Sequence, residues 1–376
     1  MALPRSKYVQ EGQEGVYHCF SRCVRRAFLY GYDTFTGQDF SHRKKWILDR
    51  LKHLTAIFAI EVCAYAIMEN HYHTILRIRP DIVASWSDRE VAARWLTLFP
   101  KHRGMGGAAI QPLEENICTL VLCPERIAQL RKRLCSLSWF MGRLNEFIAR
   151  AANKEDKVKG RFWETRFKCQ ALLDDAAIAA CMVYVDLNPI RAGLAATPEG
   201  SDFTSIQERI WLWQKETMAI APVPTVTEQG IHAGSPGKHM LIPENAAEIH
   251  NLIPERPSAM SSSLDGAVLS TCWLVPISSE SQRRGILQMT AAEYFDLVDK
   301  SGRMTRSQKR GAIDTNLAPI LLRIGANPDA WIETISSFGS QFHLAAGRLH
   351  NLRNFAVQLG RRWFKGVETV RTAFAT

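Results

Sequence analysis

The stretch Met68-Glu69-Asn70-His71-Tyr72-His73-Thr74-Ile75-Leu76 decides the fold of this chain. Its pattern is that of a strand end, a tight turn at Glu69-Asn70 and the start of a second strand. Side chains two positions apart on a strand point to the same face, so His71 and His73 share a face and Tyr72 lies on the other. Two imidazoles on one rigid face are two-thirds of a metal site, although two partly exposed strand histidines would have the same spacing.

A second informative segment runs from Ala180 to Leu194. It predicts a helix as far as Asn188, where the following Pro189 disfavours helical backbone. Tyr184 and Asn188 are four residues apart and therefore share a helix face. A phenol and an amide carbonyl on that face could supply a nucleophile and an oxygen ligand. Tyr184 could equally be a core tyrosine and Asn188 a helix C-cap.

Together the two segments resemble a known family. The His-Tyr-His of residues 71–73 and the Tyr-x-x-x-Asn-Pro-x-Arg-Ala-Gly-Leu of residues 184–194 are similar to the motifs of the single-tyrosine HUH transposases. The branch they resemble is that of the REP-associated tyrosine transposases, in which Asn stands where insertion-sequence members usually carry Gln. Residues 17–22 and 160–164 add to the resemblance, which covers about residues 14 to 212. The combined order of the motifs is specific, whereas neither motif is specific alone.

The resemblance implies an α+β fold: a ferredoxin-like, mainly antiparallel sheet with packed helices, the HUH endonuclease fold. The sequence itself predicts strands at about residues 15 to 22, 59 to 68, 71 to 79 and 166 to 172. A hairpin between the second and third strands agrees with an antiparallel core.

Helices are predicted from apolar spacing and start signals. They are expected at residues 40 to 58, from the capping box Ser87-Asp88-Arg89-Glu90 to about Leu98, and as one long helix from Pro124 to about Ala152. Arg43, Lys44 and Lys45 are expected on the outside of the first of these helices.

Three regions differ in composition. Residues 1–215 form the expected catalytic domain, with an insertion at about 81–123. Residues 216–264 carry scattered Pro, Gly and Ser without steady periodicity, which predicts a partly disordered linker. Residues 265–376 predict a basic, mainly helical C-terminal domain, as either a second DNA contact or a docking domain with a solvated face.

Charge and cysteine content narrow the class of protein. A net charge of +10 and a pI of about 9.2 favour a polyanionic partner, most simply nucleic acid. The nine cysteines are odd in number and form no CxxC pair, so we expect reduced thiols and no zinc framework. No signal peptide or membrane-spanning stretch is apparent, and a cytoplasmic protein without membrane association is expected.

The resemblance also implies a reaction. Tyr184 would attack a phosphodiester of single-stranded DNA beside a hairpin, REP-like or at an element end, and would form a 5′-phosphotyrosine link. His71, His73 and Asn188 would hold Mg²⁺ or Mn²⁺, and the protein would act as a monomer. Glu69, Asp186 and His18 are candidates for assisting proton transfer. The alternative is a catalytically inactive, transposase-derived protein that binds hairpin DNA or regulates.

Basic residues interleaved with aromatic ones are typical of a channel for single-stranded nucleic acid, where charge meets the backbone and rings meet unpaired bases. A solvated loop and a strand with core aromatics are the alternatives. The candidate DNA-binding residues are Arg22, Arg25, Arg26, Arg161, Trp163, Arg166, Lys168 and Arg191.

Overall fold

The structure is a computed structural model. It describes residues 5–10, 12–24, 29–34, 37–102, 110–220, 273–278, 284–304, 338 and 344–361.

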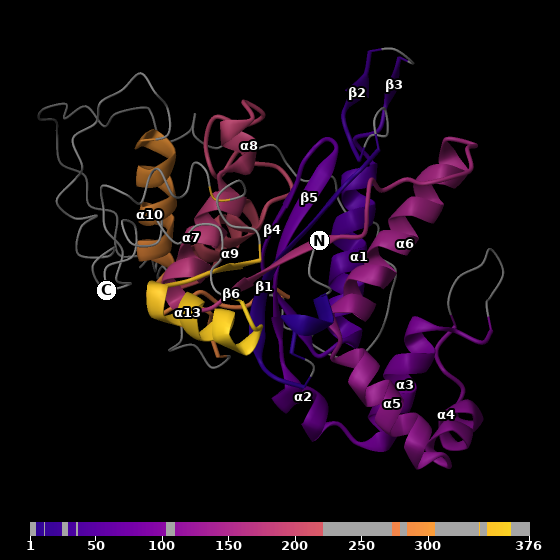
Figure 1. Ribbon diagram of the computed structural model, residues 1–376. Helices are drawn as coiled ribbons and strands as arrows, with labels where there is room; N and C mark the ends of the chain where they lie inside the picture. Colours follow the sequence, from indigo (N-terminus) through magenta and orange to yellow (C-terminus); the bar gives the residue numbers. More distant parts are fainter. Residues whose placement is uncertain are drawn as a thin grey trace, which may run out of the picture. The chain divides into compact units, whose positions relative to one another are not determined.

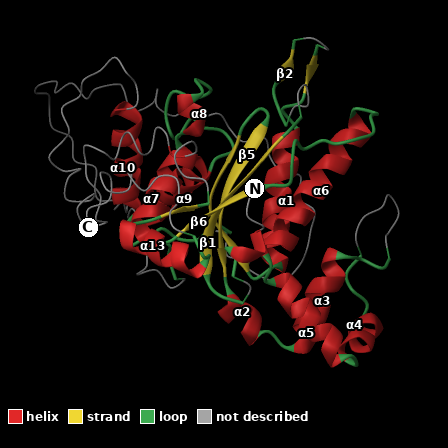
Figure 2. Ribbon diagram, viewed as in Figure 1, coloured by secondary structure: helices red, strands yellow, loops and turns green. Residues whose placement is uncertain are grey.

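A five-stranded mixed sheet lies at the centre of an α+β architecture (Figures 1 and 2). Its strand order is β4-β5-β1-β6-β7, and every neighbouring pair is antiparallel except β6 and β7, which are parallel. The strands are β1 (Gly15–Arg22), β4 (Ile60–Ile67), β5 (His71–Ile78), β6 (Lys168–Leu172) and β7 (Ala345–Ala346). A separate two-stranded sheet pairs β2 (Tyr32–Asp33) with β3 (Gln38–Asp39). The four strands predicted from the sequence are confirmed, and β7 is an addition from the C-terminal region.

The hairpin of β4 and β5 turns at Glu69 and Asn70, as the sequence predicts. The amide of Met68 donates to the carbonyl of His71 (2.8 Å) and closes the turn. Two further backbone bonds fix the turn to the chain that follows β1, because Cys23 N donates to Asn70 O (2.8 Å) and Leu29 N to Glu69 O (2.7 Å). The start of β5 is therefore held beside the end of β1.

Two helices from distant parts of the chain cover one face of the sheet (Figure 1). The helix α1 (Arg43–Ile57) buries Ile47, Leu51 and Leu54, and α6 (Leu137–Glu155) buries Phe140, Leu144 and Ile148. Both sets repeat every three or four residues and so form one apolar stripe each. The opposite face is covered by α7 (Asp175–Asp186), whose many alanines let the helix approach the strands closely.

The remaining helices are α2 (Pro80–Ser85), α3 (Asp88–Leu98), α4 (Glu114–Val121), α5 (Pro124–Leu134), α8 (Asn188–Arg191), α9 (Ser205–Ile220), α10 (Ala291–Met304) and α13 (Leu349–Gln358). The Ser87 side chain accepts from Glu90 N at the start of α3, which is one of the two bonds of the expected capping box, while the Glu90 carboxylate pairs with Arg94. No helix in the described ranges combines the length and apolar character that crossing a bilayer requires.

Two predictions about helices are wrong. The single helix expected from Pro124 to Ala152 is two helices, α5 and α6, which are interrupted at Cys135 and Ser136. Arg43, expected on the outside of α1, is 1% exposed. Its guanidinium pairs with the carboxylates of Glu155 and Asp156 at the end of α6 and lies 4.1 Å from the centroid of the Phe40 ring.

The described C-terminal segments pack on the sheet of the first 215 residues. β7 pairs with β6 on one edge, and Leu274 bridges Val62 of β4 near the other. The Tyr294 hydroxyl of α10 donates to the Asp186 carboxylate of α7 (2.6 Å). Beyond Ile220, where α9 ends, the predicted linker of residues 216–264 lies outside the described residues, as do residues 305–337 of the predicted helical C-terminal domain.

Candidate functional site

Three neighbouring strands present a polar group of side chains on the face that α7 covers. The strand register pairs Arg22 with His71, Phe20 with His73, and His18 with Ile75. Residues directly opposite each other in an antiparallel pair lie on the same face, so these side chains form successive rows beneath α7. On β6 the rows continue with Lys168 opposite Phe20 and Gln170 opposite His18. We call this group the histidine face.

The two predicted histidines lie side by side, and Tyr72 between them points away. The centroids of the His71 and His73 rings are 5.0 Å apart. The Tyr72 hydroxyl donates to Asn145 Oδ1 of α6 (2.6 Å) on the opposite face. The alternation expected from the period of the strand is confirmed.

The tyrosine helix brings the predicted nucleophile to this face. Asp174 caps α7 by accepting from Ala177 N (2.9 Å), which sets where the helix begins. Ten residues later the Tyr184 ring lies 5.6 Å from the ring of His73 and 6.0 Å from that of His18, measured between centroids. Two motifs that are far apart in the sequence therefore meet in space.

α7 ends at Asp186, and Asn188 is the first residue of the short helix α8, although Pro189 was expected to disfavour helical backbone there. Its side-chain Nδ2 donates to the backbone carbonyl of Tyr184 (3.0 Å). This bond ties Asn188 to the last turn of the tyrosine helix and leaves the side-chain oxygen as the atom that can bind a cation.

Burial sets the protonation of the histidines. It lowers the pKa of His18 and of His71 to about 4, and nearby Arg22 lowers that of His71 further. It also lowers the pKa of His73 well below its usual value, to which the other two rings contribute. All three rings are neutral at pH 7, which is the form that binds a metal ion.

Burial raises the pKa of the Tyr184 phenol, whereas a side-chain hydrogen bond with Asn188 and the charge of Arg191 lower it. The Arg191 guanidinium carbon lies 5.4 Å from the centroid of the Tyr184 ring. The two local groups thus favour the phenolate against the cost of burial.

Of the three candidates for assisting proton transfer, His18 has its ring beside that of Tyr184, with 6.0 Å between centroids. The Asp186 carboxylate instead accepts from Ser205 Oγ (2.6 Å) and from the Tyr294 hydroxyl, and holds α9 and α10 on α7. The Glu69 backbone carbonyl belongs to the hairpin turn.

Two candidate DNA-binding residues, Arg22 and Lys168, belong to the histidine face by strand register. Arg22 is exposed and lies opposite His71, and the exposed Lys168 has its Nζ 5.4 Å from the centroid of the Phe20 ring. Arg161 and Arg166 are exposed in the segment that leads into β6. This segment lies beside the end of β1, because Glu164 N donates to Arg22 O (2.9 Å).

Trp163 is held differently from these cations. Its ring lies edge-on to Tyr72, with 5.7 Å between centroids, and its Nε1 donates to the carbonyl of Asn145 (2.9 Å). Its indole thus contributes to packing against α6, on the side away from the histidines. Arg25 and Arg26, two further candidates, lie outside the described residues.

Sequence reasoning did not find two residues of this face. Gln170 hydrogen-bonds the ring of His18 (Nδ1 to Oε1, 3.2 Å), and Phe338 stacks on Tyr184 with 5.7 Å between ring centroids. The alternation of His18, Phe20 and Arg22 on the first strand is visible in the sequence. Which residues of other strands they meet is not, because this depends on long-range pairing.

The donor set fits a divalent ion of intermediate softness. His71 and His73 offer imidazole nitrogens on the histidine face, and Asn188 offers an amide oxygen from the turn after Tyr184. His71 Nδ1 is engaged with Asn70 Oδ1 (2.7 Å), so its other ring nitrogen is the one available. Among the described residues, no three His, Cys, Asp or Glu side chains gather as a metal cluster.

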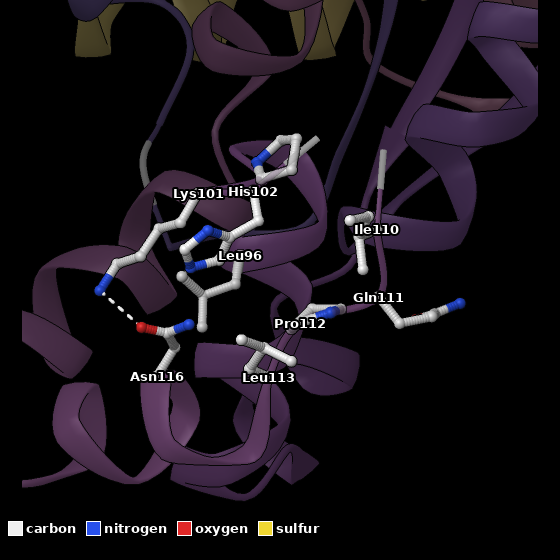
Figure 3. Close-up of a pocket in the computed structure, with 9 residues that line it drawn as sticks. Leu96, Lys101, His102, Ile110, Gln111, Pro112, Leu113 and Asn116 are labelled. Carbon is white, nitrogen blue, oxygen red and sulfur yellow. Dashed lines mark hydrogen bonds between the residues drawn. The ribbon is translucent and has the colours of Figure 1, made fainter. Parts of the chain in front are cut away.

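A pocket that the structure forms lies elsewhere, between α3, α4 and the described residues that join these two helices (Figure 3). Leu96, Ile110 and Leu113 contribute apolar lining, and Lys101 Nζ donates to Asn116 Oδ1 (3.0 Å) at its side. It contains none of the predicted site residues.

Comparison with known proteins yields one distant likeness. No family model matches the chain, and no curated protein matches it. A solved structure of a REP-associated tyrosine transposase bound to a REP hairpin is similar at a TM-score of 0.30 and 11% identity, over 64% of this chain and 100% of that one. At so low a likeness, what this chain does is inferred from its own residues.

Proposed function

We propose that this chain is a metal-dependent single-stranded DNA endonuclease and strand transferase, a transposase of the HUH type, with Tyr184 as its nucleophile. The observation that carries the proposal is the meeting of Tyr184 with His71 and His73 on one sheet face, from segments that are distant in the sequence. A phenol beside neutral imidazoles and an amide oxygen combines a nucleophile with a site for charge neutralisation.

The proposed reaction is a transfer of the DNA phosphate to the phenol of Tyr184. Tyr184 Oη attacks phosphorus, a bond between Oη and phosphorus forms, and the bond from phosphorus to the 3′ oxygen breaks. The phenol loses its proton and the departing oxygen gains one, leaving a 5′-phosphotyrosine and a free 3′-OH. Because one phosphodiester replaces another ester of similar energy, the 3′-OH of the same or another strand can reverse the step without an energy source.

His71, His73 and Asn188 are the residues proposed to hold Mg²⁺ or Mn²⁺. The ion, when bound, would act as a Lewis acid on the scissile phosphate. Two imidazoles are softer ligands than Mg²⁺ prefers, so the donor set by itself favours Mn²⁺, and Mg²⁺ enters from the family resemblance.

The proposed substrate is single-stranded DNA beside a hairpin, either REP-like or at an element end. Attack by a partly buried phenol requires an exposed, flexible backbone rather than a paired duplex. Arg22, Lys168 and Arg161 would contact phosphates, since all three are exposed, the first two on the histidine face and Arg161 in the segment beside the end of β1. Arg191, beside the Tyr184 ring, would lie at the reacting phosphate. The hairpin itself is carried over from the resemblance.

The order of the four antiparallel strands supports the ferredoxin-like fold. Numbered by their order in the chain, β1, β4, β5 and β6 are strands 1, 2, 3 and 4. Across the sheet they lie in the order 2-3-1-4, which is the strand order of a ferredoxin-like sheet. The connections α1 and α6 cover the same face. Tyr184 reaches His73 of its own chain, which is in keeping with a monomer that uses its own tyrosine. A cytoplasmic location is proposed with it.

The test is covalent capture. Wild-type protein is incubated with labelled single-stranded DNA from the flanks of its own gene and Mn²⁺ or Mg²⁺, beside Tyr184→Phe and the matched control Tyr72→Phe. We expect a protein–DNA adduct that survives denaturation in wild type and Tyr72→Phe, and none in Tyr184→Phe. An adduct in Tyr184→Phe would refute the nucleophile. Tight hairpin binding by all three proteins without any adduct would favour the inactive DNA-binding alternative.

A further inference from the structure

Two buried side chains, His18 and Gln170, extend from His73 as a hydrogen-bonded relay that the proposed reaction does not use. His73 Nδ1 lies 2.9 Å from His18 Nε2, and His18 Nδ1 lies 3.2 Å from Gln170 Oε1. The exposed fractions of His18, His73 and Gln170 are 1%, 4% and 3%. So deep in the protein, each bond is made without competition from water.

The amide at the end of this relay fixes which ring nitrogens carry protons. An amide oxygen only accepts hydrogen bonds, so Gln170 Oε1 requires a proton on His18 Nδ1. A neutral imidazole carries one proton, which leaves His18 Nε2 as an acceptor. His73 Nδ1 must then donate to it, and the lone pair of His73 is left on Nε2.

Strand pairing explains why the three groups meet. His18 and Gln170 are directly opposite each other on β1 and β6, and His73 lies opposite Phe20, diagonal to His18 on the same face. Diagonal neighbours of this kind are within reach of long or aromatic side chains. The rings of His18 and His73 are nearly parallel, at 18° with 5.1 Å between centroids.

We infer that Gln170 and His18 are positioning residues that fix the tautomer and orientation of His73, so that its Nε2 is presented to a divalent cation. The inference rests on the proposed function, since it concerns the same metal site. Ligating histidines in proteins characteristically donate their second nitrogen to a fixed acceptor, and losing that acceptor costs about 10- to 100-fold in metal affinity. Here the acceptor is itself an imidazole, oriented by an amide.

A control residue is available on the same strand. Thr74 follows His73, is buried and points to the other face, where its Oγ1 donates to the carbonyl of Cys19 (3.4 Å). Thr74→Val removes a buried hydrogen bond next to the site without touching the relay. Gln170→Glu keeps an acceptor at the end of the relay, whereas Gln170→Leu and His18→Leu remove a link.

The first measurement is independent of DNA and of activity. Long-range ¹H–¹⁵N NMR spectra of metal-free, ¹⁵N-histidine-labelled protein at pH 7 report which nitrogen of each ring is protonated. We expect His18 and His73 to carry their protons on Nδ1 in wild type and in Thr74→Val. In the spectrum of His18→Leu, we expect that His73 no longer keeps its proton on Nδ1. A proton on Nε2 of His73 in wild type would overturn the inference.

The second measurement is Mn²⁺ affinity by titration with EPR detection. We expect binding to weaken about 10- to 100-fold in His18→Leu and by a smaller factor in Gln170→Leu, with Gln170→Glu and Thr74→Val near wild type. Pulsed EPR should count two coordinated imidazoles. Three would make His18 a direct ligand and overturn the inference, as would unchanged affinity in a folded His18→Leu. A missing DNA adduct would refute only the proposed function, because neither measurement uses DNA.

Discussion

The two faces of the central sheet use polar residues in opposite ways. On the face covered by α1 and α6, Tyr72 bonds Asn145, and the Asn145 amide in turn donates to Ser21 Oγ (2.9 Å). These groups satisfy one another and hold α6 to the sheet. On the histidine face, the His71 and His73 rings lie side by side, with His73 next to Tyr184, and each is proposed to use one nitrogen for a metal ion. Residues adjacent in sequence therefore differ in role: Tyr72 bonds within the core, whereas His71 and His73 are proposed to bind a metal ion.

The largest contrast is expected between His71 and its neighbour Tyr72. His71→Ala removes a proposed ligand from a half-buried position, and we expect Mn²⁺ affinity and adduct formation to fall by more than about a hundredfold, the upper range for loss of a supporting residue. Tyr72→Phe should leave both within about twofold, because its hydroxyl bonds only on the other face. Titration with Mn²⁺ and the adduct assay measure these effects. Equal losses in the two variants would erase the distinction between the faces.

The reverse contrast concerns stability. Tyr72 is fully buried and packs against Trp163, so Tyr72→Ala should lower the free energy of unfolding by about 3–5 kcal/mol, as truncation of a core aromatic does. His71→Ala should cost about 1 kcal/mol or less, since its ring is partly exposed. Urea unfolding followed by circular dichroism gives both values. A larger loss for His71→Ala would mean that the histidine face is a folding element.

A third comparison pairs a buried arginine with an exposed one. Arg43→Ala leaves Glu155 and Asp156 without their cation at the junction of α1 and α6, and we expect a loss of about 2 kcal/mol. This is below the value for fully buried pairs because both carboxylates are partly exposed. Arg22→Ala should stay within about 0.5 kcal/mol of wild type. The same unfolding experiment measures both, and an equal loss for Arg22→Ala would assign that residue to structure.

The smallest expected effect is the one on DNA binding. Arg22→Ala should weaken binding of single-stranded DNA at low salt and reduce the slope of log affinity against log salt by about 0.7, the value for one lost phosphate contact. Lys45→Ala, on the exposed side of α1, is the matched control and should leave the slope unchanged. Fluorescence anisotropy at several salt concentrations measures the slopes. An unchanged slope for Arg22→Ala would remove this residue from the proposed interface.

Sequence reasoning located much of the fold and brought together residues of the candidate site, because their signals are local. The period of a strand put His71 and His73 together, and helical spacing put Tyr184 above Asn188. The interruption between α5 and α6 escaped prediction, because the apolar periodicity continues across Cys135 and Ser136. The burial of Arg43 escaped it too, since its partners Glu155 and Asp156 come from a helix far along the chain.

By itself the sequence determined the strands, the hairpin and the residue types of the site, because backbone geometry repeats every two or 3.6 residues whatever surrounds it. Only the tertiary structure decided that β1 lies between β5 and β6, which sets His18 against His73 and Gln170 against His18. It also decided that C-terminal residues contribute to this sheet. Such pairings depend on long-range packing between segments, and no local period in the chain encodes them.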